Sequence, residues 1–267
     1  MEPHPNKGIL YQPNSKPKYK LARYSPSPDL SHFIKRYWIV TWDLRGRAPY
    51  EQVILSHPNV NLVIEKGNSK VYGVSKMTSS HLLQGQGKVL GVKFQPGGFY
   101  PFWKAAISDL TEKSVRFQDA FGISCEALEQ EWLELEDEDG MIAGIERFFR
   151  SCLPERDEQA EFVREVVDSI AEDRELMRVD DLVHRFGIAK RTLQRLFNRY
   201  VGVSPKWVIQ RYRLHEAAAQ MEQGSAPDWS QLSTELGYFD QSHFIKDFQS
   251  IVGCSPEEYV RAVQRAD

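Results

Sequence analysis

Apolar positions follow the same spacing twice in the last third of the chain. Leucine, phenylalanine and tyrosine recur at helical intervals on either side of a glycine, which can turn the chain with a positive φ. A Ser-Pro pair then provides a helix N-cap and a proline at the first helical position. The pattern predicts two helix-turn-helix units. After one inserted residue in the second copy, the matching pairs are Leu182 with Leu232, Gly187 with Gly237, Leu193 with Phe244, Phe197 with Phe248, Gly202 with Gly253, and Ser204-Pro205 with Ser255-Pro256.

In the first unit we expect a supporting helix over 178–186 and a recognition helix over 189–200. A long helix over 205–223 joins this unit rigidly to the second. Asp228 is expected to cap the second supporting helix, and the second recognition helix follows Asp240.

The N-terminal half has a different pattern. Short runs of β-branched and aromatic residues at 33–44, 51–56, 61–65, 70–75 and 88–95 are separated by Gly, Pro or Asn. They predict an antiparallel sheet or small barrel. The first thirty residues hold six prolines and are expected to form an arm. A short helix is expected after Pro96-Gly97-Gly98, followed by amphipathic helices over 124–135, 141–152 and 158–172.

The predicted fold class is therefore α+β, with an N-terminal antiparallel β-barrel-like domain, a helical connector, and an all-α C-terminal domain. Because 267 residues exceed what one core usually serves, we expect several domains. The expected boundaries are 1–122 for the β-rich domain, 123–157 for the connector and 158–267 for the double helix-turn-helix domain.

Composition narrows the class of protein. A hydrophobic share of 41% and a charged share of 27% are typical of soluble globular proteins. No segment has the pattern of a signal peptide or a membrane span, so we expect a cytoplasmic protein with no membrane partner. The three cysteines are far apart and no histidines cluster with them. No metal and no cofactor are expected.

The net charge of −3 hides strong segregation. From Leu182 to His215 there are eight Lys and Arg residues and no Asp or Glu. Such a local field suits phosphate, although a solvated helix face is the alternative. From Glu216 to Asp247 the acids outnumber the bases by six to one. The first unit is therefore expected to supply more of the affinity for DNA.

Side chains on the outer face of each recognition helix are candidates to contact DNA. Arg can bond bidentately to guanine and Gln to adenine, whereas Arg185 and Arg199 suit phosphates. The candidates in the first unit are Lys190, Arg191, Gln194, Arg195, Asn198 and Arg199, and those in the second are Gln241, Ser242, His243 and Lys246.

The last ninety residues resemble the AraC/XylS family of bacterial transcription regulators. The match lies in RTLQRLFNRYVGVSP at 191–205 and LGYFDQSHFIKDFQSIVGCSPEEY at 236–259. The resemblance implies that Arg191, Gln194 and Arg195 face bases in one major groove and that 241–243 and Lys246 face the next. It also implies binding to double-stranded DNA and activation, more often than repression, through RNA polymerase.

The N-terminal half resembles a group of AraC-type regulators in HFIKRYWIVTW at 32–42 and VLGVKFQPGGFYPFW at 89–103. Those regulators carry a sensory or oligomerisation domain, which implies an unknown small-molecule effector or a homodimer. A candidate ligand pocket would be lined by Trp38, Trp42, Tyr72, Phe94, Tyr100 and Trp103. The alternative is that these aromatics fill an ordinary core.

Two other functions stay open. One is a small-molecule-modifying β-barrel enzyme with a DNA-binding tail, which would need a nucleophile, base or metal cluster that residues 1–120 do not suggest. The other is a ligand-independent DNA binder. The favoured hypothesis is a sequence-specific regulator that is not an enzyme.

Overall fold

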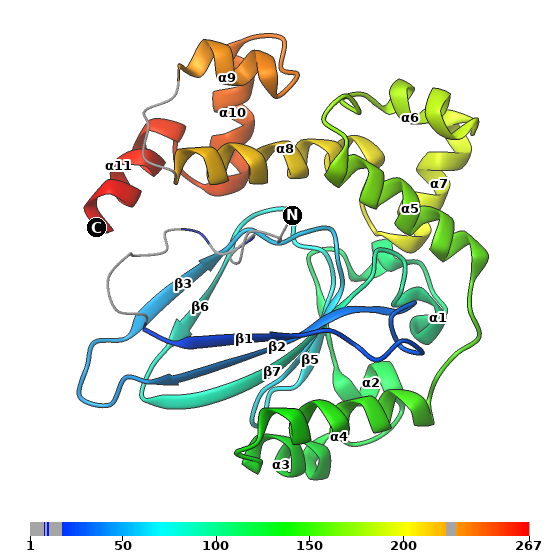
Figure 1. Ribbon diagram of the computed structural model, residues 1–267, viewed down its shortest axis with the longest axis vertical. Coiled ribbons are helices and arrows are strands. Elements are labelled where there is room, and N and C mark those ends of the chain that lie inside the picture. Colours follow the sequence, from blue (N-terminus) through cyan, green and yellow to red (C-terminus); the bar gives the residue numbers. More distant parts are fainter. Residues whose placement is uncertain (1–7, 9, 11–17, 223–227, 267) are drawn as a thin grey trace.

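Strands in the N-terminal half form two antiparallel sheets (Figure 1). The computed structural model describes residues 8, 10, 18–222 and 228–266. The larger sheet has the order β1-β2-β7-β4-β5-β8, and β3 pairs with β6. The strands are β1 (Lys20–Tyr24), β2 (Ile34–Asp43), β3 (Tyr50–Ile54), β4 (Asn61–Ile64), β5 (Lys70–Tyr72), β6 (Ser79–Leu83), β7 (Gln86–Phe94) and β8 (Ser114–Arg116).

The predicted antiparallel architecture is confirmed, with one correction. β1 and β8 are the two edges of the larger sheet, so the sheet is open and "barrel-like" describes it only loosely. Five of the strands coincide with predicted runs, whereas β1, β6 and β8 do not. β1 lies within the segment 1–30 expected to be an arm, of which residues 1–7, 9 and 11–17 lie outside the described residues.

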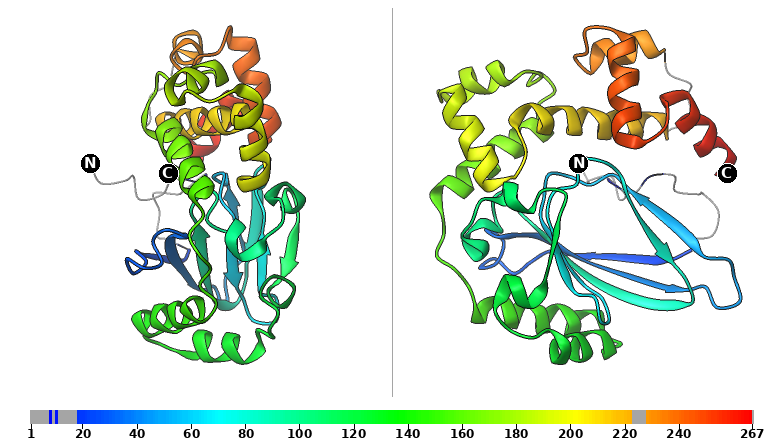
Figure 2. Two further views of the ribbon diagram at one scale, coloured as in Figure 1. Left: turned by 90° about the vertical axis from the view of Figure 1, so that its right-hand side faces the viewer. Right: turned by 180° about the vertical axis from the view of Figure 1, so that it is seen from behind.

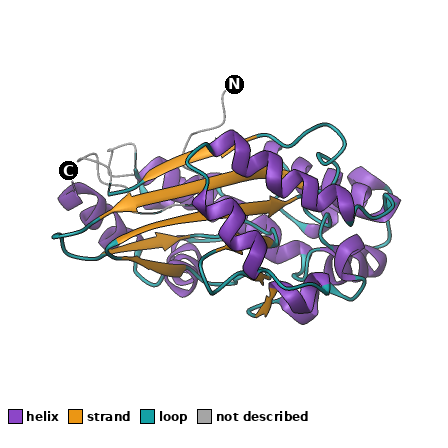
Figure 3. Ribbon diagram, turned by 90° about the horizontal axis from the view of Figure 1, so that it is seen from below, coloured by secondary structure: helices purple, strands orange, loops and turns teal. Residues whose placement is uncertain are grey.

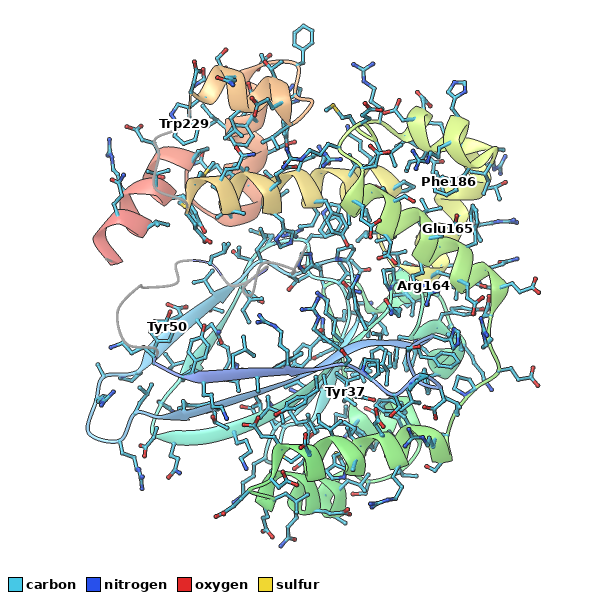
Figure 4. The ribbon with its side chains drawn as sticks, viewed as in Figure 1. Tyr37, Tyr50, Arg164, Glu165, Phe186 and Trp229 are labelled. Carbon is cyan, nitrogen blue, oxygen red and sulfur yellow. The ribbon has the colours of Figure 1, made fainter. Side chains whose placement is uncertain are left out.

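The two faces of the larger sheet have different surroundings. Tyr37 and Ile39 of β2 are buried among apolar residues on the side covered by α3 (Glu126–Glu134) and α4 (Glu138–Ser151) (Figure 3). In Figure 4 the labelled Tyr37 lies between β2 and α4. Because side chains alternate along a strand, Arg36 and Trp38 lie on the opposite face, toward β3 and β6.

Short helices cover one end of the sheet. They are α1 (Tyr100–Trp103), the 3₁₀ helix η1 (Ile107–Leu110) and α2 (Phe117–Phe121). α1 confirms the helix expected after Pro96-Gly97-Gly98. The predicted connector helices are found as α3 and α4, with Asp137 capping α4 through the backbone amides of Asp139 and Gly140.

The helices of the C-terminal half match the predicted repeat. They are α5 (Glu158–Glu172), α6 (Val179–Phe186), α7 (Lys190–Tyr200), α8 (Pro205–Met221), α9 (Trp229–Glu235), α10 (Gln241–Val252) and α11 (Pro256–Ala266). α8 crosses above the sheets and separates the two helix-turn-helix units (Figure 2).

Capping residues define the starts and turns of these helices as predicted. Ser204 accepts from the amide of Trp207, and Asp228 accepts from the amides of Ser230 and Gln231. The four aligned glycines all have positive φ, from 60° at Gly187 to 91° at Gly202 and Gly253.

Apolar packing continues across the predicted domain boundaries at 122 and 157, which stay predictions. One core cluster includes Phe94 of β7, Phe149 of α4 and Phe197 of α7. A second cluster includes Leu214 of α8, Phe248 of α10 and Leu55, which follows β3. The first unit thus shares a core with the larger sheet.

Candidate nucleic-acid interface

Local packing orients α7 as a recognition helix. Leu193, Leu196, Phe197 and Tyr200 are buried. Gly187, at φ 60°, ends α6 and turns the chain toward α7. The outer face of α7 is consequently fixed by its apolar face and not by its charged residues.

The N-terminal half of α7 presents the predicted side chains to solvent. Lys190, Arg191, Gln194 and Arg195 are exposed. Lys190 forms an ion pair with Asp180 of α6 at 2.8 Å, but both side chains are more than half exposed. Within the described part of the chain, Arg191 and Arg195 have no ion-pair partner. Their guanidinium groups are therefore available to an external acceptor.

The C-terminal half of α7 contacts the sheet domain. Arg199 donates to the hydroxyl of Tyr100, with its Nε 2.7 Å from Oη, and its guanidinium carbon lies 4.8 Å from the Tyr100 ring centroid. Ser108 donates to Asn198 at 3.3 Å, and Thr111 donates to the carbonyl of Gly202 at 2.7 Å. The candidates Asn198 and Arg199 therefore take part in docking the first unit.

The second unit repeats the arrangement with fewer charges. Phe244 and Phe248 of α10 are buried. Ser242, His243 and Lys246 are exposed, and Gln241 is half-buried. Asp240 accepts from the amide of His243 at 2.8 Å and caps the helix. α10 is tied to the joining helix by Gln210 of α8, which donates to Asp247 at 2.9 Å.

The basic stretch at 182–215 contributes less field than its composition suggests. Arg211 and Arg213 of α8 are buried, and both donate to backbone carbonyls: Arg211 to Ser75 and Lys76, Arg213 to Asp173 and Leu176. Arg185 pairs with Asp173 at 2.8 Å. The expected eight unopposed cations are thus reduced, because acids and carbonyls distant in sequence fold against them.

The candidate ligand-pocket residues separate into two groups. Trp38 and Tyr72 line a cavity of about 560 Å³ between the two sheets. Phe94 points to the other face of β7 and is fully buried in the core, and Trp103 belongs to an aromatic cluster with Phe99. Trp42 donates from its indole nitrogen to the carbonyl of Gln84, and Tyr100 meets α7. None of these last four lines that cavity.

Several cavity residues were not among the sequence candidates. Arg23, Arg36, Lys93 and His57 line it together with Trp38. Because side chains alternate along a strand, a strand over 33–44 would place Arg36 and Trp38 on one face. The pairing of β2 with β7, which brings Lys93 opposite Arg36, could not be deduced from that alternation.

Two tests concern the described residues alone. No helix there has the length and apolar character needed to cross a membrane. Within the same residues, no group of three or more His, Cys, Asp or Glu side chains is placed to hold a metal ion.

Two family models match the chain. One is described as a helix-turn-helix domain and matches residues 182–262. The other is a domain of unknown function (DUF6597) and matches residues 22–116. The first match confirms the predicted helix-turn-helix units, which make up the interface described above.

Similar proteins include an uncharacterized HTH-type transcriptional regulator of Haemophilus influenzae, 27% identical over 85 residues, and the putative HTH-type transcriptional regulator YkgA of Escherichia coli, 28% identical over 81 residues. These matches cover 32% and 30% of this chain, and 28% and 34% of the relatives. The chain thus matches about a third or less of either relative's length.

Two solved structures are similar to the chain over different shares of its length. ToxT from Vibrio cholerae is 14% identical, with a TM-score of 0.39, over 93% of this chain and 99% of that one. A probable AraC family transcriptional regulator from Rhodopseudomonas palustris is 27% identical, with a TM-score of 0.33, over 39% of this chain and 94% of that one.

Proposed function

Because residues 182–262 form a helix-turn-helix domain of the AraC type, we propose that the chain is a DNA-binding transcription regulator that reads two adjacent major-groove segments. The observation that carries the proposal is the exposed face of α7, where Arg191 and Arg195 have no ion-pair partner in the described chain and Gln194 lies between them. Arg and Gln are the side chains that bond bidentately to guanine and adenine.

The joining helix supports reading by both units at once. α8 has 17 residues, which corresponds to about 25 Å of helix. Successive major grooves on one face of DNA are about 34 Å apart. The side chains of the two units add to the distance that α8 spans. Lys246 and His243 of α10 would then enter the second groove, while Lys206, and Arg185 beside its partner Asp173, would meet phosphates.

Regulation would pass through the sheet domain. α7 is docked on α1 and η1 through Arg199, Asn198 and Gly202. An effector or a second copy of the chain that alters the sheet domain would change how α7 is presented to DNA. We further propose activation through contact with RNA polymerase.

The test is a gel-shift and footprint titration on DNA upstream of the protein's own gene. The wild type should protect two successive major grooves. The double variant Arg191→Ala/Arg195→Ala should raise Kd by about 30-fold or more, because each bidentate contact contributes about 1–3 kcal/mol.

The control variant removes the same charge from another surface. Arg116 of β8 and Arg147 of α4 are exposed, and α4 lies at the opposite end of the molecule from α7 (Figure 1). The variant Arg116→Ala/Arg147→Ala should bind as tightly as the wild type. Equal Kd values for both double variants would overturn the assignment of α7 as a recognition helix.

A further inference from the structure

Basic and apolar side chains follow one another along the wall of the cavity that β2 and β7 form. Along β2 and β7, the pairs facing it are Arg36 with Lys93, then Trp38 with Gly91, then Val40 with Val89. These positions span four residues of strand, or about 13 Å. Leu21 of β1, which is opposite Val40, adds to the apolar part of this wall. Ile54 of β3 and Leu83 of β6 line the cavity from the other sheet, together with Gln52 and His81.

Three basic side chains lie close together on this wall. Arg36 and Lys93 are directly opposite each other on neighbouring strands, where side chains lie about 5 Å apart. Arg23 of β1 is opposite Trp38 and therefore diagonal to Arg36. Like charges in such positions destabilise a sheet, so this arrangement costs free energy in the absence of a counter-charge.

The carboxylates that line the cavity are bound elsewhere. Glu65 lies 3.6 Å from His81 and accepts from Asn68. Glu112 accepts from the amide of Lys76. Among the described residues, neither glutamate forms an ion pair with Arg23, Arg36 or Lys93. Burial, followed by the charges of Arg36, Lys35 and Arg23, holds the pKa of Lys93 well below its usual value.

A flat apolar surface adjoins the cations. A Cβ atom at Gly91 would lie 1.8 Å from the Trp38 ring, so the indole rests directly on the backbone of β7. Only glycine permits this contact. The ring thus presents its other side toward the cavity, next to Arg36 along the strand.

We infer that this cavity binds an organic anion whose carboxylate or phosphate head lies among Arg23, Arg36 and Lys93 and whose apolar body lies along Trp38 and Val40. The head supplies the counter-charge that the described chain lacks at this point, through charge-assisted hydrogen bonds. A volume of about 560 Å³ is within the range of small-molecule sites.

The cavity also touches the segments that hold α8. His57 lines it and stacks on His215 of α8, with ring centroids 3.9 Å apart. Ser75 lines it too, and its carbonyl accepts from Arg211 of α8 at 3.0 Å. An effect of the anion on DNA binding rests on the proposed function. Binding of the anion itself does not, because it is measured without DNA.

The experiment is isothermal titration calorimetry of the full chain with octanoate, octyl phosphate and, as the uncharged control, 1-octanol. At least one of the two anions should bind, and 1-octanol should bind roughly tenfold or more weakly. Octanoate against octyl phosphate distinguishes the two head groups. The variants Arg36→Gln and Lys93→Met should each weaken the anion by roughly tenfold or more.

The matched control is Lys88→Gln. Lys88 lies on β7 like Lys93, but donates to the carbonyl of Leu135 at 2.6 Å and does not line the cavity. This variant should bind the anion within about twofold of the wild type. Binding of neither anion, equal binding of 1-octanol, or unchanged affinity in both cavity variants would overturn the inference.

Stability of the unliganded chain separates a binding role from a structural one. Lys93→Met should raise the midpoint of thermal unfolding, since it removes a half-buried amino group beside Arg23 and Arg36, whereas a structural role predicts a lower midpoint. DNA binding of the wild type and of each variant is measured separately by gel shift. Absence of DNA binding by the wild type would refute the proposed function, whereas DNA binding without anion binding would refute only this inference.

Discussion

Gly202 and Gly253 occupy equivalent turns of the two units, and substituting each with alanine isolates the contact between the first unit and the sheet domain. Both have φ 91°. A Cβ at Gly253 would meet nothing within 4 Å, whereas a Cβ at Gly202 would lie 2.9 Å from the carbonyl oxygen of Ile107 and 2.7 Å from Oγ1 of Thr111. The two substitutions therefore share the backbone strain and differ in the clash.

The expected cost follows from these contacts. A left-handed backbone costs alanine about 1–2 kcal/mol, so Gly253→Ala should lower the free energy of unfolding by about that amount. Gly202→Ala should cost at least about 1 kcal/mol more. It displaces the backbone of η1 and the hydrogen bond from Thr111 to the Gly202 carbonyl, which contributes about 1 kcal/mol by itself.

Urea unfolding of the full chain, followed by circular dichroism, measures both values under the same conditions. Any effect of alanine on the unfolded chain is common to the two variants and cancels in the comparison. Equal losses of stability would refute the docking of the α7–α8 turn on η1. A larger loss at Gly253 would refute it too.

Two further predictions concern the same interface. Tyr100→Phe removes the acceptor of Arg199 but keeps the ring, so amide exchange around the α7–α8 turn should accelerate; unchanged exchange, as expected for the control Tyr72→Phe, would contradict this. Lowering the pH from 7 to about 5 should destabilise the chain. Burial, His215 and Lys93 hold the pKa of His57 well below its usual value. On acidification, His57 is therefore protonated near pH 6.5 in the unfolded chain but stays neutral in the folded chain. His57→Phe should show a shallower loss of stability, and an identical pH profile would count against this account.

Sequence reasoning succeeded where the decisive interactions are local. Ser204-Pro205, Asp228 and the four aligned glycines each act within a few residues, through caps and turns, and the structure confirms them. The run of β-branched and aromatic residues at 33–44 likewise predicted β2. These features depend on the helix and strand periods and on backbone geometry, which can be recognised in a short stretch of sequence.

Sequence reasoning failed where the position of a residue is determined by a partner distant in the chain. Arg211 resembled a surface cation in a basic helix, yet the carbonyls of Ser75 and Lys76, more than 130 residues away, accept its hydrogen bonds in the interior. Lys93 lies in the predicted strand run 88–95, where nothing in the local sequence marks it as a cavity residue. Its position depends on the register of β7 with β2 and on the two-stranded sheet of β3 and β6, which lines the other side of the cavity. β8, with three residues, is a strand only because β5 lies beside it.

The two core clusters have a consequence for how such a chain can be recombined. α7 shares its apolar neighbours with β7 and α4, while α10 packs with Leu55 and the far end of α8. A graft that exchanged only the C-terminal half for that of another protein would cut through the first cluster and leave apolar surface unmatched on both sides. If α7 and α10 read DNA as proposed, the target sequence is therefore easier to exchange by changing the few exposed side chains of α7 and α10 than by transplanting the whole half, since those side chains belong to neither core.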